Sequence, residues 1–286
     1  MDRDIETTDR NPAERTVTEP DPEPRETSER SAPSRERTSH VGRHYAYQLS
    51  DAQLEAMKDI GRFRTVAAAD LASQKYEGRN SDMRRDLRSL VDQGLVQRRT
   101  VWTGPRRREL EVVVLTKRGK EVLERNAQTG SQQRIYAGFV KPAEVAHDAA
   151  IYRMFAAEAH QIENKRGRIQ RVVLDYELKQ NIYRPLAKAR ALPLLEFARL
   201  QAEVARQNGL PVIQGKIPLP DLRIEYQTKD GEMECVDLEL ATHHYHGSHL
   251  GTKVAAGFKL YSPADSAGRL RAVLEEREIT AAILSL

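Results

Sequence analysis

The sequence predicts an α+β protein with two folded domains after a polar N-terminal segment, and three observations support this fold class. Its 286 residues are enough for two domains of ordinary size. Residues 44–128 read as three helices, a two-stranded hairpin and a fourth helix. Residues 129–286 read as a helix, three strands, a helix and a strand once two inserted helices are set aside.

Composition narrows the functional classes. Charged residues make up 31% of the chain and the mean hydropathy is −0.66. No run reaches the roughly 18–20 consecutive apolar residues of a membrane helix, and no apolar signal segment opens the chain. Cys235 is the only cysteine, which excludes an intrachain disulfide and a cysteine-rich zinc site. We therefore expect a cytoplasmic protein that does not contact membranes.

Residues 1–43 are rich in Glu, Arg, Pro, Ser and Thr and carry a net charge of −3. Such a segment buries too little apolar surface to offset its ordering entropy, so we expect a disordered tail. Residues 44–130 carry +5 and the remainder +2. The positive charge is thus concentrated just after the tail.

The elements of residues 44–128 follow from their caps and apolar spacing. Ser50 caps a first helix that Gly61 ends, Thr65 caps a second, and Asn80 caps a third. In the third helix the apolar spacing predicts one buried face, made of Met83, Leu87, Leu90 and Val91. LVQRRTVWT and RELEVVVLT form a hairpin around GPRR, and Thr116 caps a last helix, KRGKEVLERNA.

This order is that of a winged helix-turn-helix, and LVQRRTV…LEVVVLTKRGKEVLE resembles the wing and following helix of many bacterial winged-helix proteins. In that fold the third helix enters the DNA major groove and the wing follows the backbone or the minor groove. Both elements are rich in long donors, which predicts double-stranded DNA as a partner. The predicted DNA-binding residues are Arg79, Asn80, Ser81, Arg84, Arg85, Arg88, Arg98, Arg99, Arg106, Arg107 and Arg108. We expect Trp102 to pack under the wing.

The second domain begins with a long helix that contains EVAHDAAIYR, followed by the strand RIQRVVLDYEL. A helical stretch follows, and Pro185 and Pro193 interrupt it. IPLPDLRIEYQ and GEMECVDLELAT form a hairpin around TKDG. The sequence then predicts SHLGTKVAAGFKLYS as a helix, RLRAVL as a strand and EEREITAAILSL as a terminal helix. The resulting αβββαβ order resembles the core of the PD-(D/E)xK nuclease-like superfamily, a restriction-endonuclease-like α/β fold.

The hairpin gathers carboxylates. Alternate residues of a strand share a face, and a turn at TKDG sets Asp221 opposite either Asp237 or Glu239. Three carboxylates on one face could bind Mg²⁺ or Mn²⁺ through oxygen ligands. The nuclease motif, however, requires a lysine two residues after the acidic strand end, and Ala241 occupies that position. Lys253 or Lys259 on the next helix could replace it.

Histidines follow the same strand. His243, His244 and His246, with His249 nearby, could bind zinc or manganese together with Asp221 and with Glu239 or Asp237, or they could be exposed loop residues. We expect His147 to pack against the site or hydrogen-bond to it rather than to bind a metal. Cys235 is expected to be a small core residue.

Taken together, the chain resembles the replication-relaxation family of bacterial mobile elements over residues 45–260. In that family a winged helix precedes a domain with a histidine on its first helix, a Pro-Asp pair and an acidic strand end. Here those correspond to His147, Asp221, and Asp237 or Glu239. The resemblance implies a role in replication, relaxation or mobilisation of plasmid or integrative DNA, with a relaxase or another mobile-element protein as a further partner.

Three functions remain open from the sequence. The first is a DNA-binding accessory protein whose nuclease-like domain is degenerate. The second is a metal-dependent endonuclease or nickase that uses Asp221, Asp237, Glu239 and Lys253. The third is a transcriptional regulator whose C-terminal domain senses a ligand or forms a homodimer.

Overall fold

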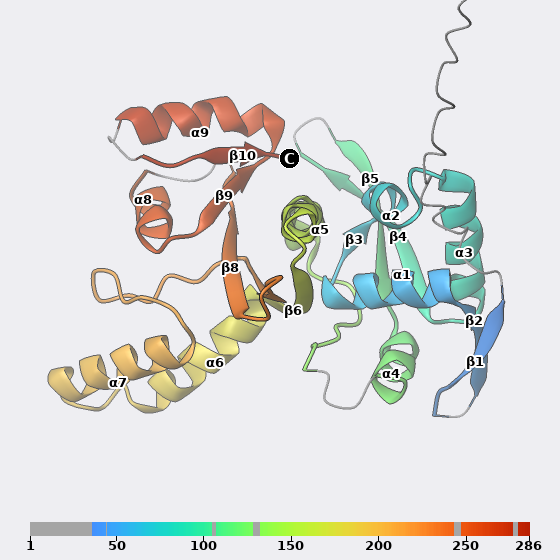
Figure 1. The fold of residues 1–286 in the computed structure, drawn as a ribbon, viewed down its shortest axis with the longest axis horizontal. Coiled ribbons are helices and arrows are strands. Elements are labelled where there is room, and N and C mark those ends of the chain that lie inside the picture. Colours follow the sequence, from blue (N-terminus) through green and yellow to red (C-terminus); the bar gives the residue numbers. More distant parts are fainter. Residues whose placement is uncertain (1–35, 44, 105–106, 128–131, 243–246, 277–279) are drawn as a thin grey trace, which may run out of the picture. The chain divides into compact units, whose positions relative to one another are not determined.

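A computed structural model describes residues 36–43, 45–104, 107–127, 132–242, 247–276 and 280–286 (Figure 1). The predicted tail of residues 1–43 therefore lies mostly outside the described residues. Its last part is described, and there the expectation of disorder is wrong. β1 (Arg37–Val41) pairs in antiparallel fashion with β2 (Ala46–Ser50).

The helices and hairpin predicted for residues 44–128 are present and include one additional short strand. The elements are α1 (Asp51–Arg62), β3 (Val66–Ala67), α2 (Ala68–Lys75), α3 (Asn80–Asp92), β4 (Val96–Thr103), β5 (Arg108–Leu115) and α4 (Lys117–Arg125). β5 is the central strand of a sheet in the order β3-β5-β4. The Ser50 hydroxyl accepts from the Gln53 amide while the Gln53 side chain accepts from the Ser50 amide, a complete capping box for α1. Thr116 caps α4 by accepting from the Gly119 amide at 3.0 Å.

Several finer predictions for this part are wrong. Gly61 lies inside α1 rather than at its end. The Thr65 side chain caps no helix, because Val66 and Ala67 first pair with β5 and α2 begins only at Ala68. Asn80 is the first helical residue of α3 and not its cap. In α3, Met83, Leu87 and Leu90 are buried as predicted, but Val91 is 38% exposed.

The second part contains a five-stranded mixed sheet in the order β10-β9-β8-β7-β6. β6, β7 and β8 are antiparallel neighbours, whereas β8, β9 and β10 run parallel. The elements are α5 (Pro142–Asn164), β6 (Arg168–Leu174), α6 (Asp175–Lys188), α7 (Leu194–Gln207), β7 (Leu222–Gln227), β8 (Met233–Leu240), α8 (Gly247–Ala255), β9 (Lys259–Ser262), α9 (Ala264–Glu276) and β10 (Ile283–Ser285). The predicted αβββαβ order is therefore present as α5-β6-β7-β8-α8-β9, with α6 and α7 inserted after β6.

The C-terminal assignments need correction. The helix predicted over SHLGTKVAAGFKLYS ends at Ala255, and Lys259–Ser262 form β9. RLRAVL lies in a helix, α9, rather than in a strand, and the chain ends with a strand, β10, rather than with a helix. Pro185 lies within α6 and does not interrupt it, whereas Pro193 does separate α6 from α7.

One hydrophobic core extends from the helices around β3 into α5 and the five-stranded sheet. The Phe63 ring, just after α1, lies 5.1 Å from the Tyr152 ring and 4.8 Å from the Phe155 ring of α5, measured between centroids. The buried Tyr152 hydroxyl donates to the equally buried Asp59 carboxylate of α1 at 3.0 Å. Arg153 forms a bidentate ion pair with Asp70 of α2 at 3.0 and 2.9 Å. Aromatic packing, one buried hydrogen bond and one exposed ion pair thus join α5 to the first helices.

Within the described residues, no helix combines the length and apolar character needed to cross a lipid bilayer.

Candidate functional site

Asp221 and Glu239 lie opposite each other across two neighbouring strands. Leu222 of β7 pairs with Leu238 of β8, so the preceding Asp221 is set against the following Glu239. The Asp221 carboxylate accepts from the Leu240 amide at 2.9 Å, which holds it against β8. Glu239 is fully buried. The register is one of the two predicted from the turn at TKDG.

Lys253 is the lysine that reaches this pair. It projects from α8, and its ammonium lies 2.8 Å from Glu239 Oε1 while donating to the Leu219 carbonyl at 2.5 Å. Lys259, the other predicted candidate, instead pairs with Glu158 at 2.6 Å, a contact outside this site. Of the two predicted replacements for the missing strand lysine, the structure brings Lys253 to the carboxylates.

Asp237 shares their face of the sheet but is bound elsewhere. Arg223 on β7 holds both Asp237 oxygens, at 2.7 and 2.8 Å, and is itself buried. The same guanidinium donates to the Asn208 carbonyl at 2.5 Å and to the Gly209 carbonyl at 3.3 Å. This network ties the end of α7 to the sheet. Asp237 therefore has a structural partner that the sequence pattern did not indicate.

His147 of α5 completes the surroundings of Asp221. Its Nε2 lies 3.6 Å from an Asp221 oxygen and its Nδ1 lies 3.7 Å from an Asp148 oxygen. The Asp148 and Asp221 contacts raise the pKa of His147 to about 10, against the opposing effect of burial. The imidazole is therefore a cation at neutral pH. Its contact with the site is an ion pair at 3.6 Å, where the sequence analysis expected packing or a hydrogen bond.

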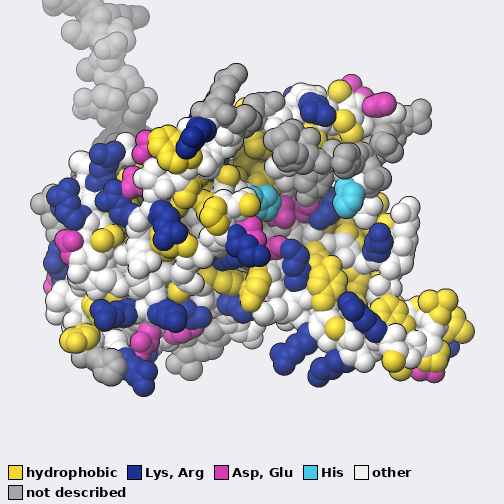
Figure 2. Space-filling model, turned by 180° about the vertical axis from the view of Figure 1, so that it is seen from behind, with side chains coloured by type: hydrophobic (Ala, Val, Ile, Leu, Met, Phe, Trp, Pro, Cys, Tyr) yellow, Lys and Arg dark blue, Asp and Glu magenta, His cyan; other side chains and the backbone are white. Residues whose placement is uncertain are grey.

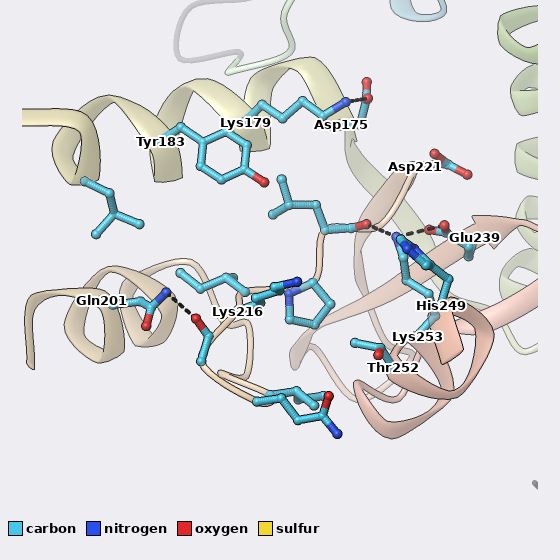
Figure 3. A pocket seen from close by; sticks show the side chains of 17 residues that line it. Asp175, Lys179, Tyr183, Gln201, Lys216, Asp221, Glu239, His249, Thr252 and Lys253 are labelled. Carbon is cyan, nitrogen blue, oxygen red and sulfur yellow. Dashed lines mark hydrogen bonds and ion pairs between the residues drawn. The ribbon is translucent and has the colours of Figure 1, made fainter. Parts of the chain in front are cut away.

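Two hollows adjoin at Asp221. One has a volume of about 600 Å³ and contains Asp221, Glu239 and Lys253 in its lining; Figure 3 shows these side chains at one end of it. The other has a volume of about 550 Å³ and is lined by His147 and its neighbours on α5, by Phe63 and Arg64 just after α1, and by the start of α6. Both hollows share Asp175, Lys179 and Asp221. Figure 2 shows histidine and acidic side chains meeting on one face, with Lys and Arg side chains around them.

The predicted metal site cannot be followed in full. His243, His244 and His246 lie outside the described residues, whereas His249 lines the hollow that contains Lys253. Among the residues that are described, no three His, Cys, Asp or Glu side chains form a group that could hold a metal ion. Cys235 is exposed, so its expected place in the core is wrong.

On the outward face of α3, some of the predicted DNA-binding arginines pair with carboxylates and others do not. Arg85 lies 2.9 Å from Asp82 and 3.6 Å from Asp86, and Arg79 lies 3.2 Å from Glu77. The remaining members of the predicted set on this helix are exposed: Asn80, Ser81, Arg84 and Arg88. None of the described carboxylates forms an ion pair with Arg84 or Arg88, so both charges face solvent.

Two of the arginines predicted to bind DNA on the β4–β5 hairpin already contact other side chains of the protein. Arg98 pairs with Glu111 across the hairpin, and the Arg99 guanidinium lies 3.9 Å from the centre of the Phe139 ring. Arg107 lies 6.0 Å from the centre of the Trp102 ring, and Trp102 is 60% exposed rather than packed under the wing. Arg108 is exposed, and Arg106 lies outside the described residues.

Sequence analysis missed several side chains of the larger hollow. These are Asp175, Lys179 and Tyr183 of α6, and Lys216 of the segment before β7 (Figure 3). Their signal was the regular spacing of polar and aromatic side chains on one side of α6.

No family model matches the chain, and no curated protein matches it. Among solved structures, the chain is similar to Bacillus subtilis PadR in complex with operator DNA, with 16% identity over 54% of this chain and 94% of that one. The TM-score is 0.21, at which the likeness establishes neither a shared fold nor a shared activity.

Proposed function

We propose that this chain binds double-stranded DNA through α3 and the β4–β5 hairpin, as a winged helix-turn-helix protein. The observation that carries the proposal is the exposed pair Arg84 and Arg88, whose charges have no acidic partner among the described residues. A helix in the major groove needs long, unoccupied donors on its outward face. These two lie four residues apart, on one side of α3, next to the buried face made of Met83, Leu87 and Leu90.

A mobility-shift assay on duplex DNA tests this proposal. Arg84→Ala with Arg88→Ala should weaken binding strongly, because two unpaired cations are lost. Arg85→Ala is the matched control on the same helix: Asp82 and Asp86 already neutralise its charge, so the loss should be smaller. Duplex binding that survives the double substitution would show that α3 does not contact DNA.

A narrower form of the proposal is an accessory role in the replication, relaxation or mobilisation of a mobile element. Its support is the resemblance in sequence described above, together with the proximity of His147, Asp221 and Glu239 in space. Binding to the origin region of such an element, in preference to unrelated duplex, is the expected result. Equal affinity for the origin region and for unrelated duplex would refute this narrower role.

A second candidate function is metal-dependent cleavage of a DNA strand, and the position of Lys253 favours it. Asp221 and Glu239 would hold a divalent cation through carboxylate oxygens, and such an ion activates water and stabilises the charge that develops on a phosphate. Lys253 would bind the same phosphate as a cation. The two carboxylates fit such an ion as oxygen donors, and Asp237 does not add a third, because it is held by Arg223.

Supercoiled plasmid with Mg²⁺ or Mn²⁺ tests this second function. Metal-dependent nicking that is lost in Asp221→Ala and in Lys253→Ala, but kept in Lys259→Ala, would establish it. Lys259 is the matched control, since it has the same side chain but pairs with Glu158 instead. Intact plasmid under all conditions would make the carboxylate pair structural.

A further inference from the structure

Helix α6 presents a ridge of two aromatic rings with a cation between them. Tyr176, Lys179 and Tyr183 are spaced i, i+3 and i+7, so their side chains emerge on one side of the helix over about 10 Å. Tyr176 is 43% exposed and Tyr183 is 52% exposed. The face of the helix beside the ridge is buried in an apolar cluster through Leu178, Ile182 and Leu186. The ridge is therefore rigidly mounted and faces outward.

The ridge runs along both hollows. Tyr176 lines the smaller one, Tyr183 lines the larger one, and Lys179 lines both, next to Asp221. Figure 3 shows the Tyr183 ring projecting from α6 into the larger hollow, with Lys216 on the opposite side. The Tyr176 ring has an edge contact with Tyr136 at 6.4 Å between centroids, which supports it from one side. A ligand that follows α6 therefore passes both rings and reaches the Asp221–Glu239 pair.

The charges around the ridge suit a polyanion. Residues 178–195 contain four basic side chains and no acidic one: Lys179, Arg184, Lys188 and Arg190. Of these, only Lys179 has an ion-pair partner among the described residues, Asp175 at 2.5 Å. The Arg134 guanidinium, which has no ion-pair partner among the described residues, also lies 5.1 Å from the centre of the Tyr176 ring.

The carboxylates in the two hollows do not oppose this charge, because each has a cation beside it. Asp221 lies 3.6 Å from the His147 ring nitrogen, Glu239 lies 2.8 Å from the Lys253 ammonium, and Asp175 pairs with Lys179. In the smaller hollow, Glu144 and Asp148 lie 3.3 and 3.4 Å from the Arg64 guanidinium. Lys141 and Lys216 remain exposed in the lining without a described acidic partner.

We propose that the α6 ridge binds an unpaired DNA strand and leads it past Asp221. Exposed aromatic rings interspersed with cations are the means by which proteins hold single strands, because each unpaired base offers a face for stacking. A duplex buries those faces within its own stack, so the tyrosines would gain nothing from it. The proposal goes beyond duplex binding by α3, and it holds whether or not the carboxylate pair cleaves the strand.

Fluorescence anisotropy with the full chain, in EDTA so that no metal-dependent cleavage occurs, tests the ridge. The probes are a labelled mixed-sequence single-stranded DNA and a labelled blunt duplex of the same sequence. Tyr176→Ala with Tyr183→Ala should weaken single-strand binding by at least about fivefold for each ring and leave duplex binding unchanged. Tyr176→Phe with Tyr183→Phe keeps both rings and should bind the strand like the wild type.

Two controls separate this proposal from the previous one. Tyr45→Ala removes a ring that is 65% exposed but lines neither hollow, and it should change neither affinity. Arg84→Ala with Arg88→Ala should weaken duplex binding and leave single-strand binding intact. If that arginine variant keeps full duplex affinity while the alanine ridge variant still loses the strand, the duplex proposal fails and the ridge stands.

Three outcomes would overturn the ridge. The first is single-strand affinity that is unchanged in the alanine variant. The second is an equal loss of single-strand and duplex affinity, which would assign the tyrosines to the fold. The third is tighter binding of an RNA strand of the same sequence, which would replace DNA as the ligand.

Discussion

The buried hydroxyl of Tyr152 offers a quantitative test of how the two parts of the molecule are joined. Tyr152 and Asp59 are each 1% exposed, and their oxygens are 3.0 Å apart. Burial and the Asp59 charge raise the pKa of Tyr152 far above its usual value, so the hydroxyl remains a donor at any ordinary pH. Tyr152→Phe removes this donor while leaving the ring in contact with Phe63 and Phe155.

The expected loss of unfolding free energy depends on the ion pairs that Asp59 retains in the variant. A hydrogen bond to a charged group contributes about 1.5–3 kcal/mol. Lys75 at 3.1 Å and Arg62 at 3.5 Å still compensate the carboxylate, so we expect about 2 kcal/mol. With a urea dependence of about 3 kcal/mol per molar, the unfolding midpoint should fall by about 0.7 M.

Urea unfolding followed by circular dichroism measures this loss, and Tyr226→Phe is the matched control. The Tyr226 hydroxyl also donates to a carboxylate, Glu234 at 2.5 Å, but near the surface, where the same change should cost less than about 0.5 kcal/mol. A midpoint for Tyr152→Phe no lower than that for Tyr226→Phe would refute the reasoning that burial of the Asp59 contact sets its energy.

Three further results are expected. The slope of log affinity for duplex against log salt should fall by about 2 in the Arg84→Ala, Arg88→Ala variant, since each phosphate contact contributes about 0.9; an unchanged slope would mean that neither arginine contacts a phosphate. In metal-free buffer, the difference in unfolding free energy between the wild type and His147→Gln should be greatest below about pH 6.5. It should disappear as the pH rises through about 10, because the pKa of His147 is raised in the folded state. A difference that does not depend on pH would contradict the ion pair between His147 and Asp221. Thr116→Ala should lower the free energy of unfolding by about 1 kcal/mol in a denaturant titration, because α4 loses its N-terminal cap. An unchanged free energy would show that the cap does not stabilise the protein.

Sequence reasoning succeeded where a local signal determines the structure. The Ser50 capping box and the Thr116 cap mark real helix starts. The two-residue alternation of β7 and β8 narrowed the residue opposite Asp221 to Asp237 or Glu239, and the structure has Glu239 there. Both kinds of signal depend on neighbours in the chain or across one tight turn.

It failed where distant contacts decide. RLRAVL reads as a strand because it is short and apolar, yet Leu270 and Leu274 are buried at a helical spacing in α9. Asp237 was grouped with the other carboxylates because nothing in the sequence shows that Arg223 is buried beside it and also binds the end of α7. Likewise, no signal in the sequence indicates that Trp102 is exposed rather than packed under the hairpin.

The core that continues from the first helices into α5 bears on how such a protein can change over evolution. A DNA-reading unit on a free linker can be exchanged between proteins as a separate piece. Here, severing the chain between α4 and α5 would uncover Phe63 and Tyr152 and leave Asp59 without its hydroxyl donor. The first helices and the sheet with its carboxylate pair thus share one core, and replacing either part by an unrelated unit would expose apolar surface. Under the proposed DNA binding, a new target would therefore be gained by substitutions on the surface of α3 rather than by exchange of whole units.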